Sequence, residues 1–169
     1  MTSANNNILV IDDTPENLTV LRRILTDRGY RVRPALSGEL ALNSIKKDRP
    51  DLILLDVMMP GMDGFEVCRR LKSEIGTRGI PILFISALNE TEDKVKAFQS
   101  GGVDYIAKPF HVDEVLARVE THLKLCQMHK EIEGQNLQLQ NEVEERKKAE
   151  KALEKVNLKL ERLALLGLS

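Results

Sequence analysis

DLILLD, residues 51–56, sets four consecutive apolar side chains between two aspartates. A short, continuous apolar run of this kind predicts a strand that is buried on both faces of a parallel sheet. The runs Ile8–Ile11 and Ile80–Ile85 have the same character, and weaker strand candidates lie at Tyr30–Ala35 and Val103–Ala107. We therefore expect five strands that share one sheet.

Amphipathic helical patterns separate these apolar runs. Their defining side chains recur at intervals of three and four residues: Leu18, Leu21 and Leu25; Cys68, Leu71 and Ile75; Val95 and Phe98. Thr14-Pro15 is a suitable start for the first helix, residues 63–66 (DGFE) have capping-box spacing for a later one, and Asn89 opens the next. The alternation predicts an α/β protein, a three-layer sandwich around a five-stranded parallel sheet.

Polar side chains stand where the predicted strands end. Asp12 and Asp13 follow the first strand, Asp56 ends the third, Ser86 ends the fourth and Lys108 follows the fifth. In such sheets ligands bind beyond the carboxyl ends of the strands. Clustered carboxylates repel one another unless a cation neutralises them, and oxygen ligands suit Mg²⁺. A carboxylate can also accept a phosphoryl group, which an ammonium and a hydroxyl would stabilise. Taken singly, each residue fits a turn or a cap; the combination indicates phosphoryl chemistry.

Four motifs carry a family resemblance: ILVIDD at 8–13, DLILLDVMMPGMDG at 51–64, SA at 86–87 and GGVDYIAKPF at 101–110. Together they resemble the receiver domain of two-component response regulators over residues 8–122. The resemblance implies a flavodoxin-like strand order, which is also known from a receiver protein. It further implies phosphorylation by a sensor histidine kinase.

The resemblance implies a role for each acidic residue of the predicted site. Asp56 would be the phosphate acceptor. Mg²⁺ would be bound by the carboxylates of Asp13 and Asp56 and by the backbone carbonyl of Met58, with Asp12 joining through a water.

The remaining matching residues are implied to recognise the phosphoryl group and to report it. Lys108 would pair with the group and Ser86 would bond one of its oxygens. Ser86 and Tyr105 would form the switch that changes with activation, and Pro109 would follow a cis peptide bond, a form nearly confined to proline. The glycines of residues 60–64 favour a tight loop with positive φ.

The chain after Phe110 contains neither proline nor aromatic residues. We expect one continuous helix from about Val112 to Leu165, with a heptad pattern typical of a parallel, dimeric coiled coil. The apolar residues of the predicted dimer seam are Leu125, Met128, Ile132, Leu139, Leu153, Val156, Leu160 and Leu163. Polar layers at Gln135, Glu142 and Arg146 weaken its centre. The predicted domains are thus a receiver at 1–122 and a coiled-coil helix at 123–169.

Composition limits the classes of partner. The chain has 25 basic and 26 acidic residues, so we expect no nucleic-acid binding through bulk charge. It has no apolar run of about 18 residues, and Met1–Asn7 does not resemble a signal peptide. Cys68 and Cys126 form no metal-binding or disulfide pattern. We therefore expect a cytoplasmic protein without a membrane partner.

Three functional interpretations remain at this point. The first is a non-enzymatic phosphorylation switch whose helix passes the signal to a partner or to a missing module, because residues 160–169 resemble the connector before diguanylate cyclase or histidine kinase modules. The second is a constitutive dimeric scaffold. The third is a phosphatase with an aspartyl nucleophile, although the haloacid dehalogenase pattern places Asp-x-Asp after the first strand, where this chain has Asp12-Asp13.

Overall fold

The computed structural model describes residues 5–87 and 91–167. The elements alternate along the chain in the order β1 (Asn7–Ile11), α1 (Pro15–Asp27), β2 (Arg31–Ala35), α2 (Gly38–Lys47), β3 (Leu52–Asp56), α3 (Gly64–Ser73), β4 (Ile82–Ser86), α4 (Thr91–Gln99), β5 (Asp104–Ala107) and α5 (Val112–Gly167). The chain divides into two compact units, Met1–Cys126 and Gln127–Ser169.

The five strands form one parallel sheet in the order β2-β1-β3-β4-β5, the flavodoxin-like arrangement that the resemblance implied. Each predicted apolar run supplies one strand. All residues of β1, β3 and β4 are buried, as expected for strands covered on both faces. Pro34 lies in β2 at the edge of the sheet, where its missing N–H costs no ladder hydrogen bond.

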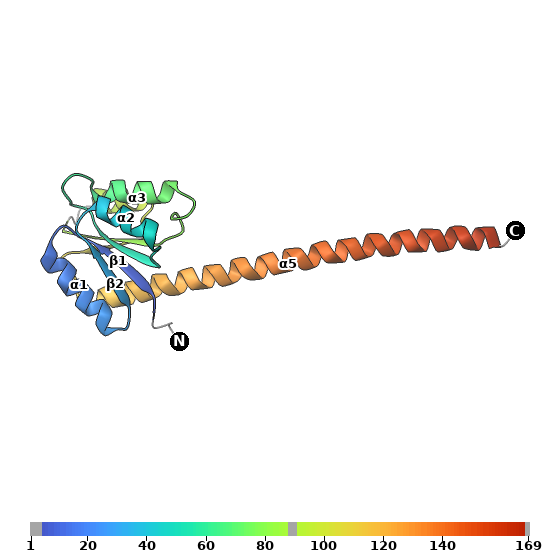
Figure 1. Cartoon of the computed structure of the whole chain (residues 1–169), viewed down its shortest axis with the longest axis horizontal. Helices are drawn as coiled ribbons and strands as arrows, with labels where there is room; N and C mark the ends of the chain where they lie inside the picture. Colours follow the sequence, from blue (N-terminus) through green and yellow to red (C-terminus); the bar gives the residue numbers. More distant parts are fainter. Residues whose placement is uncertain (1–4, 88–90, 168–169) are drawn as a thin grey trace. The chain divides into compact units, whose positions relative to one another are not determined.

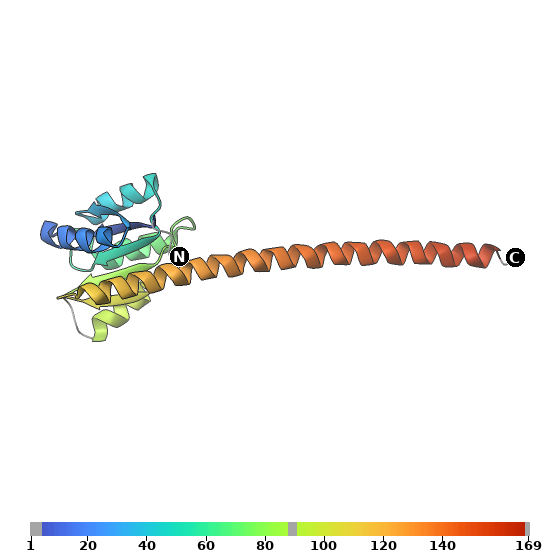
Figure 2. The same ribbon diagram turned by 90° about the horizontal axis from the view of Figure 1, so that it is seen from below.

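Helices cover both faces of the sheet (Figures 1 and 2). On one face, side chains of α1 and of the first turns of α5 pack against Ile8, Val10 and Leu54. On the other face, α2, α3 and α4 pack against Leu9 and Ile53. The neighbouring residues of one strand therefore serve opposite cores, because successive side chains of a strand alternate between faces.

The predicted helix patterns hold except at Ile75, but they do not identify which helix face is buried. α3 ends at Ser73, so Ile75 lies beyond it and is 81% exposed. Val95 and Phe98 of α4 are also exposed, and Ala97 is the buried residue of that helix. An interval of three residues identifies a helix but does not decide which of its faces meets the sheet. The predicted start at Asn89 lies outside the described residues.

Helix starts agree better with the sequence. α1 begins at Pro15 as predicted, although the Thr14 side chain makes no capping hydrogen bond. α3 begins at Gly64 with Asp63 as its cap, and the Asp63 carboxylate accepts a 2.9 Å hydrogen bond from the Glu66 backbone N–H. The Glu66 carboxylate completes no capping box, since it pairs with Arg69 and Arg70 instead.

The last helix, α5, runs from Val112 to Gly167, in agreement with the predicted continuous helix. Within residues 127–167 every residue is exposed. The predicted seam residues from Leu125 to Leu163 are between 47% and 63% exposed. Among the described residues, no helix combines the length and the hydropathy that crossing a membrane requires.

Candidate functional site at the carboxyl ends of the strands

The parallel sheet brings the predicted site residues together at the carboxyl ends of its strands. Asp12 directly follows β1, Asp56 ends β3 and Lys108 directly follows β5. Asp12, Asp13 and Asp56 each offer a carboxylate oxygen, and these three atoms lie within 4.8 Å of one another. The Lys108 Nζ lies 3.1 Å from Asp12 Oδ2 and 3.4 Å from Asp56 Oδ2. Residues that are far apart in the sequence therefore form one acidic pocket with a single ammonium.

The Asp12 carboxylate is held in place from both of its oxygens. Its Oδ1 accepts a 2.9 Å hydrogen bond from the Thr14 backbone N–H, and its Oδ2 accepts one of 3.2 Å from the Asn17 side-chain amide. Asp12 is only 1% exposed. Sequence reasoning missed Asn17, whose signal is its position in the first turn of a helix that begins beside two aspartates.

The Asp56 carboxyl is buried and electrostatically crowded. Burial and, after it, the charge of Asp12 raise its pKa from 3.8 to about 6, while Lys108 and the Met58 backbone N–H oppose the rise. The Met58 N–H donates to Asp56 Oδ1 over 3.3 Å. The crowded carboxyl would gain from a nearby cation, and a set of carboxylate oxygens suits a hard divalent ion such as Mg²⁺. The residues at this edge therefore fit a magnesium site.

Ser86 and Tyr105 lie together beside these acids. Ser86 ends β4 and is fully buried, and Tyr105 in β5 is 7% exposed. Burial raises the pKa of Tyr105, and a side-chain hydrogen bond with Ser86 opposes the rise. The Lys108–Pro109 peptide bond is cis.

Comparison with known proteins identifies this arrangement. Residues 8–120 match the family model of the response regulator receiver domain. The chain belongs to this family. Over 114 residues it is 46% identical to the response regulator PleD of Caulobacter vibrioides, a match that covers 68% of this chain and 25% of PleD. It is 43% identical over 117 residues to the DNA-binding dual master transcriptional regulator RpaA of Synechocystis, covering 69% of this chain and 48% of RpaA.

Solved structures support the same family. A putative response regulator from Chloroflexus aurantiacus superposes with a TM-score of 0.69 at 38% identity, covering 71% of this chain and 98% of that one. A Francisella receiver domain gives a TM-score of 0.67 at 32% identity, over 71% and 98% of the two chains. The chain thus contains a complete receiver fold but spans half or less of the length of PleD and RpaA.

Gly64 supports the position of Asp56 through close packing. A Cβ at Gly64 would lie 2.3 Å from the Asp56 backbone oxygen, and the Gly64 N–H donates to the Val57 carbonyl over 2.9 Å. The expected positive φ of this loop occurs at Gly61, with a φ of 76°, and not at Gly64. Only a residue without a side chain lets the start of α3 approach the end of β3 so closely.

Proposed function

We propose that this receiver accepts a phosphoryl group on Asp56 from a sensor histidine kinase in a Mg²⁺-dependent reaction. The observation that carries the proposal is the placement of the Lys108 ammonium 3.4 Å from Asp56 Oδ2, beside the carboxylates of Asp12 and Asp13. These groups supply a nucleophile, a fixed positive charge and ligands for a metal at one point.

Each residue has a distinct task in this reaction. With a pKa of about 6, Asp56 is mostly ionised at neutral pH, so its oxygen can attack phosphorus. Lys108 lies where it can neutralise the transferred phosphoryl oxygens, and the Ser86 hydroxyl can bond one of them. Asp13, Asp56 and the Met58 backbone carbonyl would hold Mg²⁺, with Asp12 acting through a water. When bound, the ion would neutralise the crowded acids and the phosphoryl oxygens.

The acceptor can be tested by incubating the chain with acetyl phosphate and Mg²⁺ and measuring its intact mass. We expect one added phosphoryl group that is absent from Asp56→Asn and does not form when EDTA is present from the start. Asp51→Asn is the matched control, because Asp51 lies just before the other end of β3 and accepts from the Asn7 backbone N–H. A phosphoryl group retained in Asp56→Asn, or none in the folded wild-type chain, would contradict the proposal.

We further propose that the helix beyond the receiver forms a parallel homodimer and passes the phosphorylation state to a partner or to a further module. Its support is the exposed seam: each of the eight apolar seam residues leaves about half or more of its surface uncovered. A helix of this length that exposes a leucine stripe in water is stabilised by pairing. The polar layers at Gln135, Glu142 and Arg146 reduce the stability of one fixed pairing, which suits a helix that responds to the receiver.

Light scattering on the whole chain, with and without acetyl phosphate, tests the dimer. The double variant Leu153→Lys with Leu160→Lys should give a monomer. Leu158→Lys, which lies off the seam, should keep the wild-type mass. A wild-type chain that is monomeric at tens of micromolar both with and without acetyl phosphate would refute the dimer. A dimer of the same mass under both conditions would favour the constitutive scaffold.

The direction of pairing can be read from a spin label on Cys126. The other cysteine, Cys68, is fully buried, so the label selects one site. In a parallel dimer the two labels lie across the seam from each other. In an antiparallel dimer they would be separated by about 60 Å, since a helix rises 1.5 Å per residue.

We propose a regulatory and cytoplasmic role rather than an enzymatic one. The acceptor would hold its phosphoryl group, whereas a phosphatase would turn over steadily. One matched relative is named as an enzyme, a probable cyclic di-GMP phosphodiesterase of Vibrio cholerae, and is 36% identical over 136 residues. Because this chain covers only 31% of that protein, the name does not assign an enzymatic activity to this chain. Steady hydrolysis of p-nitrophenyl phosphate that depends on Asp56 would instead favour the phosphatase interpretation.

A further inference from the structure

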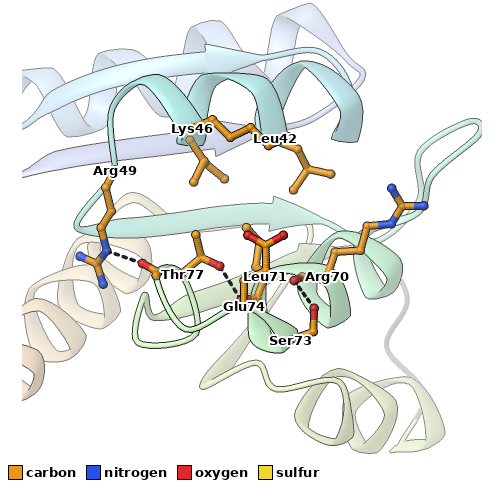
Figure 3. A pocket seen from close by; sticks show the side chains of 10 residues that line it. Leu42, Lys46, Arg49, Arg70, Leu71, Ser73, Glu74 and Thr77 are labelled. Atoms are coloured by element: carbon orange, nitrogen blue, oxygen red, sulfur yellow. Dashed lines mark hydrogen bonds between the residues drawn. The ribbon is translucent and has the colours of Figure 1, made fainter.

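A cavity of about 380 Å³ lies near the amino-terminal ends of the strands, whereas Asp56 stands at the carboxyl end of β3. It is bounded by the C-terminal parts of α2 and α3 and by the loop that leads to β4 (Figure 3). Leu42, Ile45 and Leu71 give it an apolar floor. Six of the ten lining residues have polar or charged side chains, and pockets of this size that combine apolar surface with polar groups are typical of small-molecule sites.

Side chain to backbone hydrogen bonds fix the wall of this cavity. The Arg49 Nε donates to the Gly76 carbonyl over 3.0 Å, and the Thr77 hydroxyl donates to the Leu71 carbonyl over 2.6 Å. The first bond joins this loop to the segment between α2 and β3, and the second joins it to the last turns of α3, so the cavity is formed before any ligand binds (Figure 3). A preformed site reduces the entropy that binding costs.

The rim of the cavity carries more positive than negative charge. Lys46, Arg49 and Arg70 contribute three cations and Glu74 contributes one carboxylate. Arg70 pairs with Glu66 over 3.0 Å. Within residues 5–87 and 91–167, neither Lys46 nor Arg49 has an acidic group within 4.0 Å.

The helix ends modify this charge without reversing it. α2 and α3 both direct their C-terminal carbonyls toward this end of the domain, and such ends carry partial negative charge. Lys46 and Arg70 lie in the last turns of these helices and offset it. An anion would therefore bind the side-chain cations at the rim and not the helix ends.

We propose that this cavity binds a small amphipathic carboxylate, with its apolar body on Leu42, Ile45 and Leu71 and its carboxylate at Lys46 and Arg49. The apolar floor, and three cations against the one carboxylate of Glu74, favour this class over neutral or cationic ligands. The site is separate from the phosphoryl acceptor, and occupancy of one does not require the other.

The probe is 2-naphthoate, compared with 2-naphthalenemethanol, which keeps the rings and lacks the charge. Titration into the ¹⁵N-labelled whole chain should shift the amide signals of Ile45, Leu71 and Gly76 in a saturable way. Lys46→Gln should weaken naphthoate binding about three- to five-fold, as expected for one exposed ion pair, and leave the alcohol unchanged. The matched control is Lys47→Gln, since Lys47 neighbours Lys46 on α2 and does not line the cavity.

The outcomes separate the proposal from its alternatives. No saturable shift at these amides would overturn the site. Equal affinity for acid and alcohol would overturn the assigned ligand class, as would equal weakening by Lys46→Gln and Lys47→Gln. Unchanged naphthoate binding in Asp56→Asn is expected, because the cavity and the acceptor lie at opposite ends of β3.

Discussion

Leucine side chains are used in opposite ways by the two compact units of this chain. In the unit Met1–Cys126, Leu9 and Leu54 have no exposed surface, because helices cover both faces of the sheet. In the unit Gln127–Ser169, Leu137 and Leu139 are 60% and 57% exposed. The residue type is the same, and what differs is whether the unit provides its own cover.

This contrast separates two sources of stability. The receiver is stabilised by burial within one chain, so its unfolding should not depend on protein concentration. If the helical unit pairs with a second copy as proposed, its stability should rise with protein concentration. Tyr30 and Tyr105 are the chain's two tyrosines and it has no tryptophan, so intrinsic fluorescence reports the receiver alone.

A substitution in the receiver core should cost the most stability. Leu54→Ala removes a fully buried side chain and should lower the free energy of unfolding by about 3 kcal/mol. Leu137→Ala, in the exposed helix, should change the same transition by less than about 0.5 kcal/mol. Urea unfolding followed by tyrosine fluorescence measures both, and equal losses would mean that the two units do not unfold separately.

The charge of Asp56 in the acidic pocket should lower the stability of the receiver at neutral pH. Folding places Asp56 where its pKa is about 6 instead of 3.8, so at pH 7.5 the native state must hold an unfavourable charge. Asp56→Asn removes that charge and should stabilise the receiver by on the order of 2 kcal/mol at pH 7.5. Because protonation relieves the same repulsion, the difference should shrink as the pH falls through 6 and vanish below about 4.

Urea titrations of both proteins at matched pH values measure this difference, and other titrating groups cancel in the comparison. Added Mg²⁺ should stabilise the wild-type chain more than Asp56→Asn, and EDTA should remove the gain. Equal stability of the two proteins at pH 7.5 without metal would show that the charge of Asp56 does not destabilise the native state.

A smaller effect tests the contact between α3 and β3. Gly64→Ala places a Cβ 2.3 Å from the Asp56 backbone oxygen, and the neighbouring atoms are backbone atoms of Asp56 and Val57, so no flexible side chain can move aside. We expect a loss of about 1–3 kcal/mol and slower phosphoryl uptake from acetyl phosphate. Gly76→Ala is the control, because a Cβ there has no atom within 4 Å. A neutral Gly64→Ala would remove the close-packing argument.

A substitution in the helical unit should have a smaller effect than any of these. Gly134 lies within α5, and a Cβ there meets nothing within 4 Å. Gly134→Ala should stabilise the helix by up to about 1 kcal/mol and raise the thermal midpoint of its circular dichroism signal. The tyrosine transition should not move. A shift in both transitions would indicate that the helix and the receiver unfold as one unit.

The strands were predictable because their residues are buried on both faces. The runs around Leu9, Leu54 and Phe84 are apolar without interruption, and a short run of that kind is typical of a strand covered by helices on both sides. Helix faces were harder, because Val95 and Phe98 repeat at a helical interval although the sheet meets Ala97. Only the packing of the whole domain decides which side of α4 is covered.

The charged residues of the site were predictable for a different reason. Asp12, Asp56 and Lys108 stand at the ends of strands, and parallel strands place those ends at one edge. The residues that support them, Asn17 and Gly64, were not predictable. They act through close contacts with Asp12 and Asp56, and residue spacing in the sequence does not reveal such contacts. A glycine that matters through close approach is not distinguishable in the sequence from one that serves a turn, such as Gly61.

Lys108 also has a consequence for how the protein is made. Its ammonium is supplied by the end of β5, 96 residues after Asp12, and it is in contact with both buried acids. During synthesis the aspartates leave the ribosome long before their counter-charge does. A chain that ends before residue 108 lacks the ammonium that offsets the repulsion between Asp12 and Asp56, so the complete acidic pocket forms only once β5 has been made.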